Sequence, residues 1–159
     1  MTSKYDVIVV GGGHAGVEAA LAASRMHANT LLITSCKDAL ARMPCNPSIG
    51  GLAKSHLVYE LDALGGEMGI NADLTALQAK TLNLSRGPAV WATRCQCAKK
   101  EYTERMQRVV ASQPCLTTLE DAALCILTTT SSSGSGPVVT GIQTESHGVF
   151  TAAAVVITS

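Results

Sequence analysis

The stretch YDVIVVGGGHAG, from Tyr5 to Gly16, decides the fold. Tyr5–Val10 is a continuous, β-branched apolar run that glycines end, which is typical of a buried parallel strand. The next six residues match G-x-G-x-x-G. In that motif Gly11 makes the tight turn, Gly13 lets a pyrophosphate approach the backbone, and Gly16 lets helix and strand pack closely. The N–H groups and positive dipole end of the following helix then bind phosphate.

The residues that follow complete a βαβ unit. Gly16–Met26 is alanine-rich with a small, apolar helical face, and Thr30–Thr34 is a second short strand. Such a unit has a right-handed crossover. One element of the motif is absent, because Leu32–Ser35 contains no acid to bind the adenosine ribose. A hydroxyl or a backbone group is an alternative for that role. His14 either touches a phosphate or is a solvent-exposed loop residue.

Further elements follow from local patterns. Met43–Gly51 has turn chemistry, and Ser48 is expected to cap a helix whose leucines continue to Leu64, with Gly65-Gly66 ending it. Proline in the first turn predicts a second helix over Pro88–Ala111. Its charged Lys99–Arg108 face is expected to be solvated.

The last third is rich in strand patterns. Leu116–Leu127 and Val138–Glu145 are strand-like, the SSSGSG tract Ser131–Gly136 is a polar hairpin loop, and Ala152–Thr158 is a buried strand. The prediction is a doubly wound α/β fold of the Rossmann type, in which residues 115–150 form a small β-meander. We expect residues 1–159 to be a single N-terminal domain segment of a longer protein, because the chain ends directly after an apolar strand.

Composition restricts the class of protein. No apolar run approaches the roughly 20 residues of a membrane span, and the early run Val7–Val10 is too short for a signal peptide. Lys plus Arg (12) equals Asp plus Glu (12), so the chain as a whole has no electrostatic attraction for nucleic acid. Six cysteines have no regular spacing, and free thiols are expected. Cys95 and Cys97 form C-x-C without a second pair, so no metal site is predicted.

Four blocks of sequence together carry a family resemblance. GGGHAGVEAA, MPCNPSIGGLAK, ELDALGG and LNLSRGPAVWATR occur in this order. Their order and spacing resemble the start of the MnmG (GidA) family of tRNA-modifying flavoenzymes. The resemblance runs over nearly the whole chain and is weakest between Ser112 and Thr151.

The resemblance implies a glutathione-reductase type of FAD-binding domain and a cytoplasmic FAD-dependent enzyme that acts as a homodimer. With the GTPase MnmE, such an enzyme installs a carboxymethylaminomethyl-type group at C5 of the wobble uridine of tRNA. Methylene-tetrahydrofolate supplies the carbon, and NADH reduces the flavin. By position, the FAD contacts fall at Gly11, Gly12, Gly13, His14, Ala15, Gly16 and, through its backbone, Ala123.

Cys45 and three basic residues in the family-like blocks are further candidates. Cys45 precedes an expected helix N-terminus, which favours the thiolate, so it is either a thiol near the flavin or a small buried residue that packs a turn. Lys54, Arg86 and Arg94 either line a groove facing flavin or RNA phosphate, or are solvated charges. Neutralising Arg94 is expected to weaken tRNA binding and its salt dependence.

The chain also departs from the family pattern. Trp91 stands where most members have Arg, His27 replaces a customary Gly, and the loop Thr128–Pro137 is longer than usual. These changes affect local contacts rather than the class. Two alternatives remain at this stage: a generic FAD/NAD(P)H oxidoreductase, which would lack the MPCNPSIGG and SRGPAV blocks, and a nucleotide-binding module without turnover. We expect this chain alone to be inactive.

Overall fold

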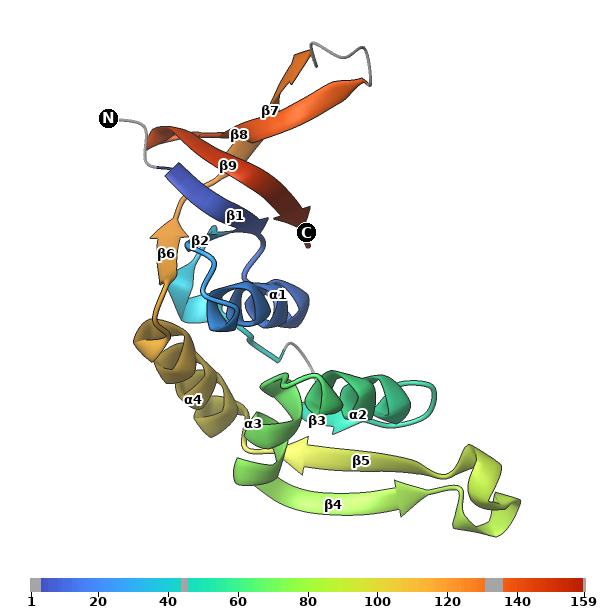
Figure 1. Ribbon diagram of the computed structural model, residues 1–159. Helices are drawn as coiled ribbons and strands as arrows, with labels where there is room; N and C mark the ends of the chain where they lie inside the picture. The colour runs from blue at the N-terminus through green and yellow to red at the C-terminus, as the bar shows by residue number, and fades with distance from the viewer. Residues whose placement is uncertain (1–3, 44–45, 131–135, 159) are drawn as a thin grey trace. The chain divides into compact units, whose positions relative to one another are not determined.

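The structure is a computed structural model that describes residues 4–43, 46–130 and 136–158 (Figure 1). The chain divides into two compact units, Met1–Leu40 with Val109–Ser159, and Ala41–Arg108. Each unit has its own sheet, and we describe each by itself. Within the described residues, no helix combines the length and apolar character needed to cross a membrane.

The first unit is built on a six-stranded sheet. Its strands, in spatial order, are β6 (Leu116–Glu120), β2 (Thr30–Thr34), β1 (Lys4–Val10), β9 (Gly148–Ile157), β8 (Pro137–Thr144) and β7 (Ala123–Thr130). The first four run parallel, and β9, β8 and β7 are antiparallel neighbours. This confirms the α/β prediction, with the sheet parallel where the βαβ unit was expected.

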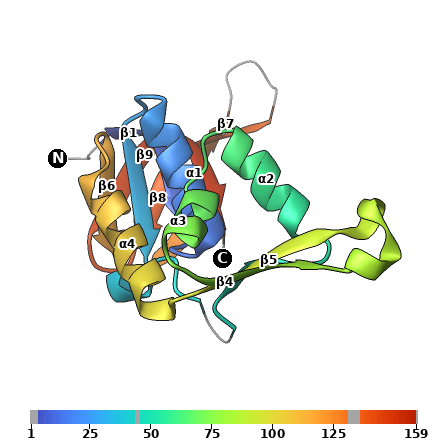
Figure 2. The ribbon, with the colours of Figure 1, turned by 90° about the horizontal axis from the view of Figure 1, so that it is seen from below.

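Helix α1 (His14–Arg25) connects β1 to β2 and lies across the parallel strands (Figure 2). Its buried side chains include Val17 and Leu21, one turn apart. A buried cluster in the same unit joins strands from both parts of the sheet: Ile8, Leu31, Ile33, Ile142 and Ala152. Burial of a large aliphatic side chain contributes about 1.5–3 kcal/mol, so this cluster fixes the sheet.

The meander prediction is wrong at one end. Leu116–Glu120 pairs in parallel with β2, and only β7, β8 and β9 form the antiparallel meander. The strand-like stretch Leu116–Leu127 contains β6 and the first part of β7, separated at Asp121 and Ala122. The polar hairpin loop expected at Ser131–Gly136 lies, except for its last residue, outside the described residues.

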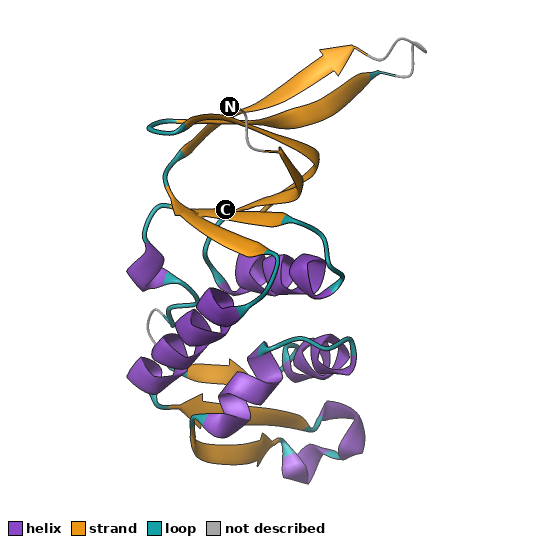
Figure 3. Cartoon of the chain, turned by 60° about the vertical axis from the view of Figure 1, so that its left-hand side comes forward, coloured by secondary structure: helices purple, strands orange, loops and turns teal. Residues whose placement is uncertain are grey.

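The second unit contains a smaller, antiparallel sheet, in the order β3 (Ser48–Gly50), β5 (Ala92–Cys97) and β4 (Ala76–Leu82). Helices α2 (Ser55–Ala63) and α3 (Met68–Leu74) contact this sheet (Figure 3). Two short 3₁₀ turns, η2 (Leu84–Arg86) and η3 (Pro88–Val90), join β4 to β5. Helix α4 (Lys99–Ser112) follows β5, and a further 3₁₀ turn, η1 (Lys37–Ala39), belongs to the first unit.

Two predictions of secondary structure fail in the second unit. Ser48 does not cap a helix, because it lies in β3 and the positive φ angles of Gly50 and Gly51 separate it from α2. The helix expected over Pro88–Ala111 is a 3₁₀ turn, a strand and then α4. Alternating burial along β5 and pairing on both of its edges override the helical pattern there. The predicted helix stop at Gly65-Gly66 is confirmed, since α2 ends at Ala63.

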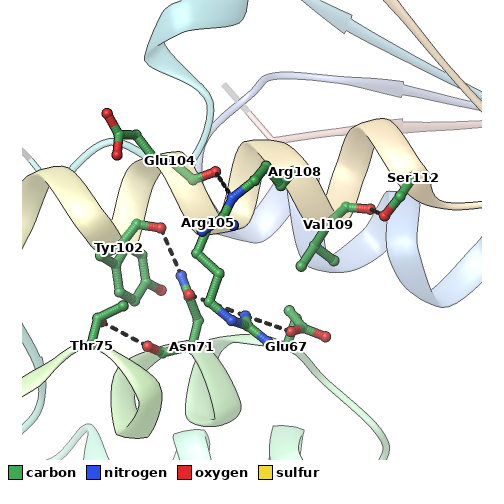
Figure 4. Close-up of polar contacts among 9 residues, drawn as sticks. All are labelled: Glu67, Asn71, Thr75, Tyr102, Glu104, Arg105, Arg108, Val109 and Ser112. Atoms are coloured by element: carbon green, nitrogen blue, oxygen red, sulfur yellow. Dashed lines mark hydrogen bonds and ion pairs between the residues drawn. The ribbon is translucent and has the colours of Figure 1, made fainter.

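The charged face of α4 is not wholly solvated, contrary to expectation. Arg105 donates to the Glu67 carboxylate at 2.7 Å and to Asn71 Oδ1 at 3.1 Å (Figure 4). The Asn71 amide donates to the Tyr102 carbonyl at 2.9 Å, and Thr75 Oγ1 donates to the Asn71 carbonyl at 2.7 Å. The Glu67 side chain is only 7% exposed, and its ion pair with Arg105 connects the start of α3 to the middle of α4.

Helix α1 ends in a Schellman motif with His27 in the left-handed position. The His27 N–H donates to the Ser24 carbonyl at 2.9 Å, and the Ala28 N–H donates to the Ala23 carbonyl at 3.1 Å. His27 has a φ of 64°, a conformation that glycine adopts without a steric cost. This conformation is the physical reason to expect glycine at the position, as the family resemblance implies.

We therefore expect His27→Gly to raise the free energy of unfolding by about 0.5–1 kcal/mol. Relief of the left-handed penalty is worth about 1–2 kcal/mol and is partly offset by the greater entropy of glycine in the unfolded chain. Chemical denaturation measures the change. His27→Ala is the control because it removes the imidazole but keeps the strained conformation; an equal gain from both variants would contradict the explanation.

Candidate cofactor-binding site

The glycine loop lies at the carboxyl end of β1. At this strand the order of the strands reverses, because β2 and β6 lie on one side of β1 and β9 lies on the other. The Gly11 N–H donates to the Ile33 carbonyl of β2, and the Thr158 N–H donates to the Val10 carbonyl, both at 2.9 Å. The ends of three parallel strands thus meet at the loop. In open α/β sheets, ligands bind at such a topological switch point.

Three of the four loop glycines are closed in by their neighbours. A Cβ atom on Gly16 would overlap the Gly11 carbonyl oxygen, and one on Gly12 would overlap Thr34 Oγ1. At Gly11, a Cβ atom would lie 2.5 Å from Thr158 Oγ1, and the φ of 115° is one that side chains rarely adopt. These three glycines are therefore required by the packing of the loop itself, whether or not a ligand is bound.

Gly13 is different, because the space beside it is open. A Cβ atom there would meet no described atom within 4 Å, and its φ of −70° is accessible to any residue. Gly13 is the N-cap residue of α1, and no side chain of the described residues caps this helix end. An open position at an uncapped helix start is where a phosphate group would approach the backbone. The residues present therefore fit a dinucleotide.

His14 is the first residue of α1 and is partly buried, so it is not the exposed loop residue of the second alternative. Burial lowers the pKa of His14 below its usual value. Its imidazole is therefore neutral at neutral pH and offers a phosphate no positive charge.

A carboxylate missed by the sequence analysis lies beside the end of β2. Thr34 closes β2, and the register places Glu120, at the end of β6, beside it. The Lys37 N–H donates to Glu120 Oε2 at 2.7 Å, which holds this carboxylate at the carboxyl edge of the sheet. The two strands are far apart in sequence, so the position of Glu120 beside Thr34 follows only from the parallel pairing of β6 with β2.

Ala123 is the first residue of β7, and Asp121 fixes the chain just before it. The Asp121 carboxylate accepts hydrogen bonds from the N–H groups of Ala122 and His147, at 2.8 and 3.0 Å, and from His147 Nδ1 at 2.7 Å. Ser146 N–H donates to both its oxygens at 3.2 Å. Burial raises the pKa of Asp121, but these hydrogen bonds lower it by more, so the pKa lies well below its usual range. The carboxylate thus ties the start of β7 to the β8–β9 turn.

The other candidates belong to the second unit. Lys54 precedes α2, Arg86 ends η2, and Arg94 lies in β5; all three are exposed. Arg94 donates to Ser48 Oγ at 3.3 Å. Cys45 lies outside the described residues, and its role stays a prediction.

The Cys95 and Cys97 thiols are buried on one side of β5, with their sulfur atoms 3.9 Å apart. Burial, and then the neighbouring Cys95, raise the pKa of Cys97 to about 11, so its thiol stays protonated at neutral pH. Among the described residues there is no group of three or more metal-ligating side chains.

The switch-point loop and the mixed sheet define a Rossmann-type dinucleotide-binding domain. The family model for glucose inhibited division protein A matches residues 6–159, and the chain belongs to this family, which the sequence blocks indicated. The MnmG tRNA uridine 5-carboxymethylaminomethyl modification enzyme of Mycoplasma capricolum is 51% identical over 159 residues, and that of Streptococcus suis is 52% identical over 156. The chain spans about a quarter of the length of these relatives, 24% of each.

Solved structures agree with this assignment. Aquifex aeolicus GidA is 42% identical, with a TM-score of 0.89 over 98% of this chain and 25% of that one. A GidA-related protein from Thermus thermophilus shares the fold alone, at 16% identity and a TM-score of 0.60 over 96% of this chain and 52% of its own.

Two alanine variants should separate packing from binding at the loop. Gly16→Ala is expected to lower the free energy of unfolding by about 1–3 kcal/mol or more, because its methyl group overlaps the Gly11 carbonyl. Gly13→Ala is expected to change it by less than about 0.5 kcal/mol but to weaken FAD binding by about tenfold or more. Denaturation without FAD, and FAD titration, measure the two effects. If Gly13→Ala bound FAD with wild-type affinity, the open space beside Gly13 would not be the place where the cofactor phosphate approaches.

The low pKa of Asp121 predicts a pH-dependent contribution to stability. Its carboxylate stabilises the fold fully above the unfolded pKa, about 3.9, and this contribution falls as the pH drops below that value towards the folded pKa. Asp121→Asn should therefore lower Tm at pH 7, and the gap from wild type should narrow towards pH 3. If the difference in Tm between the two proteins stayed constant from pH 7 to pH 3, the charge of Asp121 would not contribute to stability.

Proposed function

We propose that the full-length protein containing this chain is an FAD-dependent enzyme that modifies C5 of the wobble uridine in tRNA. The observation that carries the cofactor assignment is the open Gly13 position between the closed Gly11, Gly12 and Gly16, at the switch point of a parallel sheet. The tRNA assignment is supported by the relatives, which are named as tRNA uridine 5-carboxymethylaminomethyl modification enzymes.

The loop residues would hold the pyrophosphate of FAD through backbone N–H groups at the start of α1. Bound FAD would supply the redox chemistry. Ala123 would contact the cofactor through its backbone, and Asp121 positions that backbone through four donors on two adjacent segments. Neutral His14 adds no charge at the phosphates, so the helix end and its N–H groups provide the attraction.

Glu120 would replace the ribose-binding acid that β2 lacks. Its carboxylate lies one strand away from the usual place, at the same level as Thr34, and one oxygen already accepts the Lys37 N–H. A carboxylate accepts several hydrogen bonds at once, which leaves capacity for the ribose hydroxyls.

Residues of the second unit would contact the tRNA and the flavin. Lys54, Arg86 and Arg94 are exposed cations suited to RNA phosphate or flavin, and Cys45 would act as a thiol near the flavin. By the family resemblance, NADH reduces the flavin, methylene-tetrahydrofolate supplies the carbon, and a homodimer works with the GTPase MnmE in the cytoplasm. Family membership favours this function over a generic FAD/NAD(P)H oxidoreductase.

The first test is a visible spectrum of the purified chain and its melting curve with and without FAD. At 100 times the dissociation constant, FAD should stabilise the fold by about 2.7 kcal/mol and raise Tm by about 5–10 °C. Glu120→Gln should bind FAD about tenfold more weakly, through loss of charge-assisted hydrogen bonds. Exposed Glu104→Gln on α4 is the matched control. Absence of a flavin band and of any Tm shift, in both this chain and the full-length protein, would refute the cofactor assignment.

The chain by itself should not turn over, because it spans only about a quarter of its relatives. It would then be a nucleotide-binding module, the second function considered for the isolated chain. NADH-driven reduction of flavin by the purified 159-residue chain would contradict this, whereas the same reaction in the full-length protein is expected.

A further inference from the structure

We propose that the outer face of the sheet β3-β5-β4 binds the phosphate backbone of RNA, with Lys80 and Arg94 as its principal contacts. This inference rests on the proposed function and adds to it a surface and a residue, Lys80, that the sequence motifs do not identify. We call this surface, made of Ser48, Gln78, Lys80, Arg94 and Gln96, the sheet face.

The two sides of β5 have different roles. On one side, Thr93 Oγ1 accepts a hydrogen bond from the Tyr59 hydroxyl of α2 at 2.6 Å, and the Cys95 thiol donates to the Ala72 carbonyl of α3 at 3.5 Å. Side chains alternate along a strand, so Arg94 and Gln96 are on the side away from these helices. Both are exposed.

The register extends this side across the sheet. Lys80 is paired with Arg94, Gln78 with Gln96, and Gln96 with Ser48 on the other edge. Lys80 and Gln78 are exposed as well. Neighbouring strands lie about 4.7–4.9 Å apart, so the two cations and the polar groups form one continuous surface over three strands.

The direct pairing of Lys80 with Arg94 is unfavourable in the protein alone. Like charges opposite one another destabilise a sheet, while an opposite-charge pair would stabilise it by up to about 1 kcal/mol. No carboxylate relieves the repulsion from within the hairpin, because residues 76–97 contain Lys80, Arg86 and Arg94 and no acid. Arg94 instead directs its guanidinium to Ser48 Oγ, at 3.3 Å.

The acidic residues of this unit follow a different distribution. They lie in or next to the helices: Glu60, Asp62, Glu67, Asp73, Glu101 and Glu104. A chain with no net charge thus presents a locally cationic sheet face. A bound anion would supply the countercharge that the sheet lacks.

The polar groups indicate an RNA backbone rather than another anionic partner. Contacts to phosphate and sugar come from Arg and Lys together with Ser and Gln, which are the residue types of the sheet face. Binding in a membrane interface is strengthened by buried apolar side chains, and none of the five residues of the sheet face is apolar. Exposed aromatic side chains for base stacking are absent from it too, so the contact would be to the backbone.

The test measures tRNA affinity against salt concentration for the full-length protein and the variants Lys80→Gln and Arg94→Gln. Each is expected to weaken binding about tenfold and to reduce the slope of log K against log salt by about one. Lys80→Arg should retain the slope because it retains the charge. Lys100→Gln, which removes an exposed cation from α4 in a pair with Glu104 at 3.7 Å, is the matched control and should leave the slope unchanged.

Folding is monitored in the same variants through Tm. Loss of the like-charge pair should leave Tm unchanged or raise it slightly in Lys80→Gln, so weaker binding would not result from unfolding. An unchanged salt slope in both glutamine variants, while the wild type binds tRNA, would overturn the inference and leave the proposed function standing. Failure of the wild type to bind tRNA would overturn both. Lys80-dependent binding to phosphatidylserine vesicles with unaltered tRNA binding would identify a membrane surface instead and overturn the RNA contact.

Discussion

The close approach of helix α1 to strand β1 is the constraint on which the nucleotide site depends. At Gly16, the helix lies so near the Gly11 carbonyl that no side chain fits between them. This approach sets the position of the helix N-terminus over the carboxyl end of β1, and with it the direction of the N–H groups in the first turn of α1. Apolar packing below the loop, at Ile8, Leu31 and Ile33, keeps the strand ends in place. The site is thus formed mainly by backbone and held by apolar packing.

The two units provide chemistry in different ways. In the first, the groups near the switch point are backbone N–H donors and two carboxylates, Glu120 and Asp121, each fixed by hydrogen bonds from neighbouring backbone. In the second, exposed side chains are carried by a small sheet whose other side is packed against helices. A rigid loop suits a cofactor that must be held in one geometry, and flexible cations suit a polyanion, whose binding is tolerant of small displacements.

Sequence patterns identified the parts of the structure that local rules determine. The strand Tyr5–Val10, the glycine loop, the start of α1 and the strand Thr30–Thr34 were all recognisable, because a short buried parallel strand needs a continuous apolar run and the loop needs glycines. Strand β4 was not predicted, since most of ALQAKTL is exposed and its pairing with β5 gives no local apolar signal. For the same reason the helical interpretation of residues 92–97 failed: pairing with two strands overrode propensity. Glu120 and Lys80 depend on register between distant segments, which no local pattern contains.

The distribution of the family-like blocks has a physical explanation. The G-x-G-x-x-G loop lies in the first unit. The three other blocks, MPCNPSIGGLAK, ELDALGG and LNLSRGPAVWATR, all lie within residues 41–108, the second unit. Dinucleotide binding by backbone imposes glycines and little else, so the first unit constrains its sequence weakly outside the loop and core. The second unit presents specific side chains on a surface, and only specific residues meet that demand. We therefore expect the features that distinguish one reaction from another to be located in the second unit.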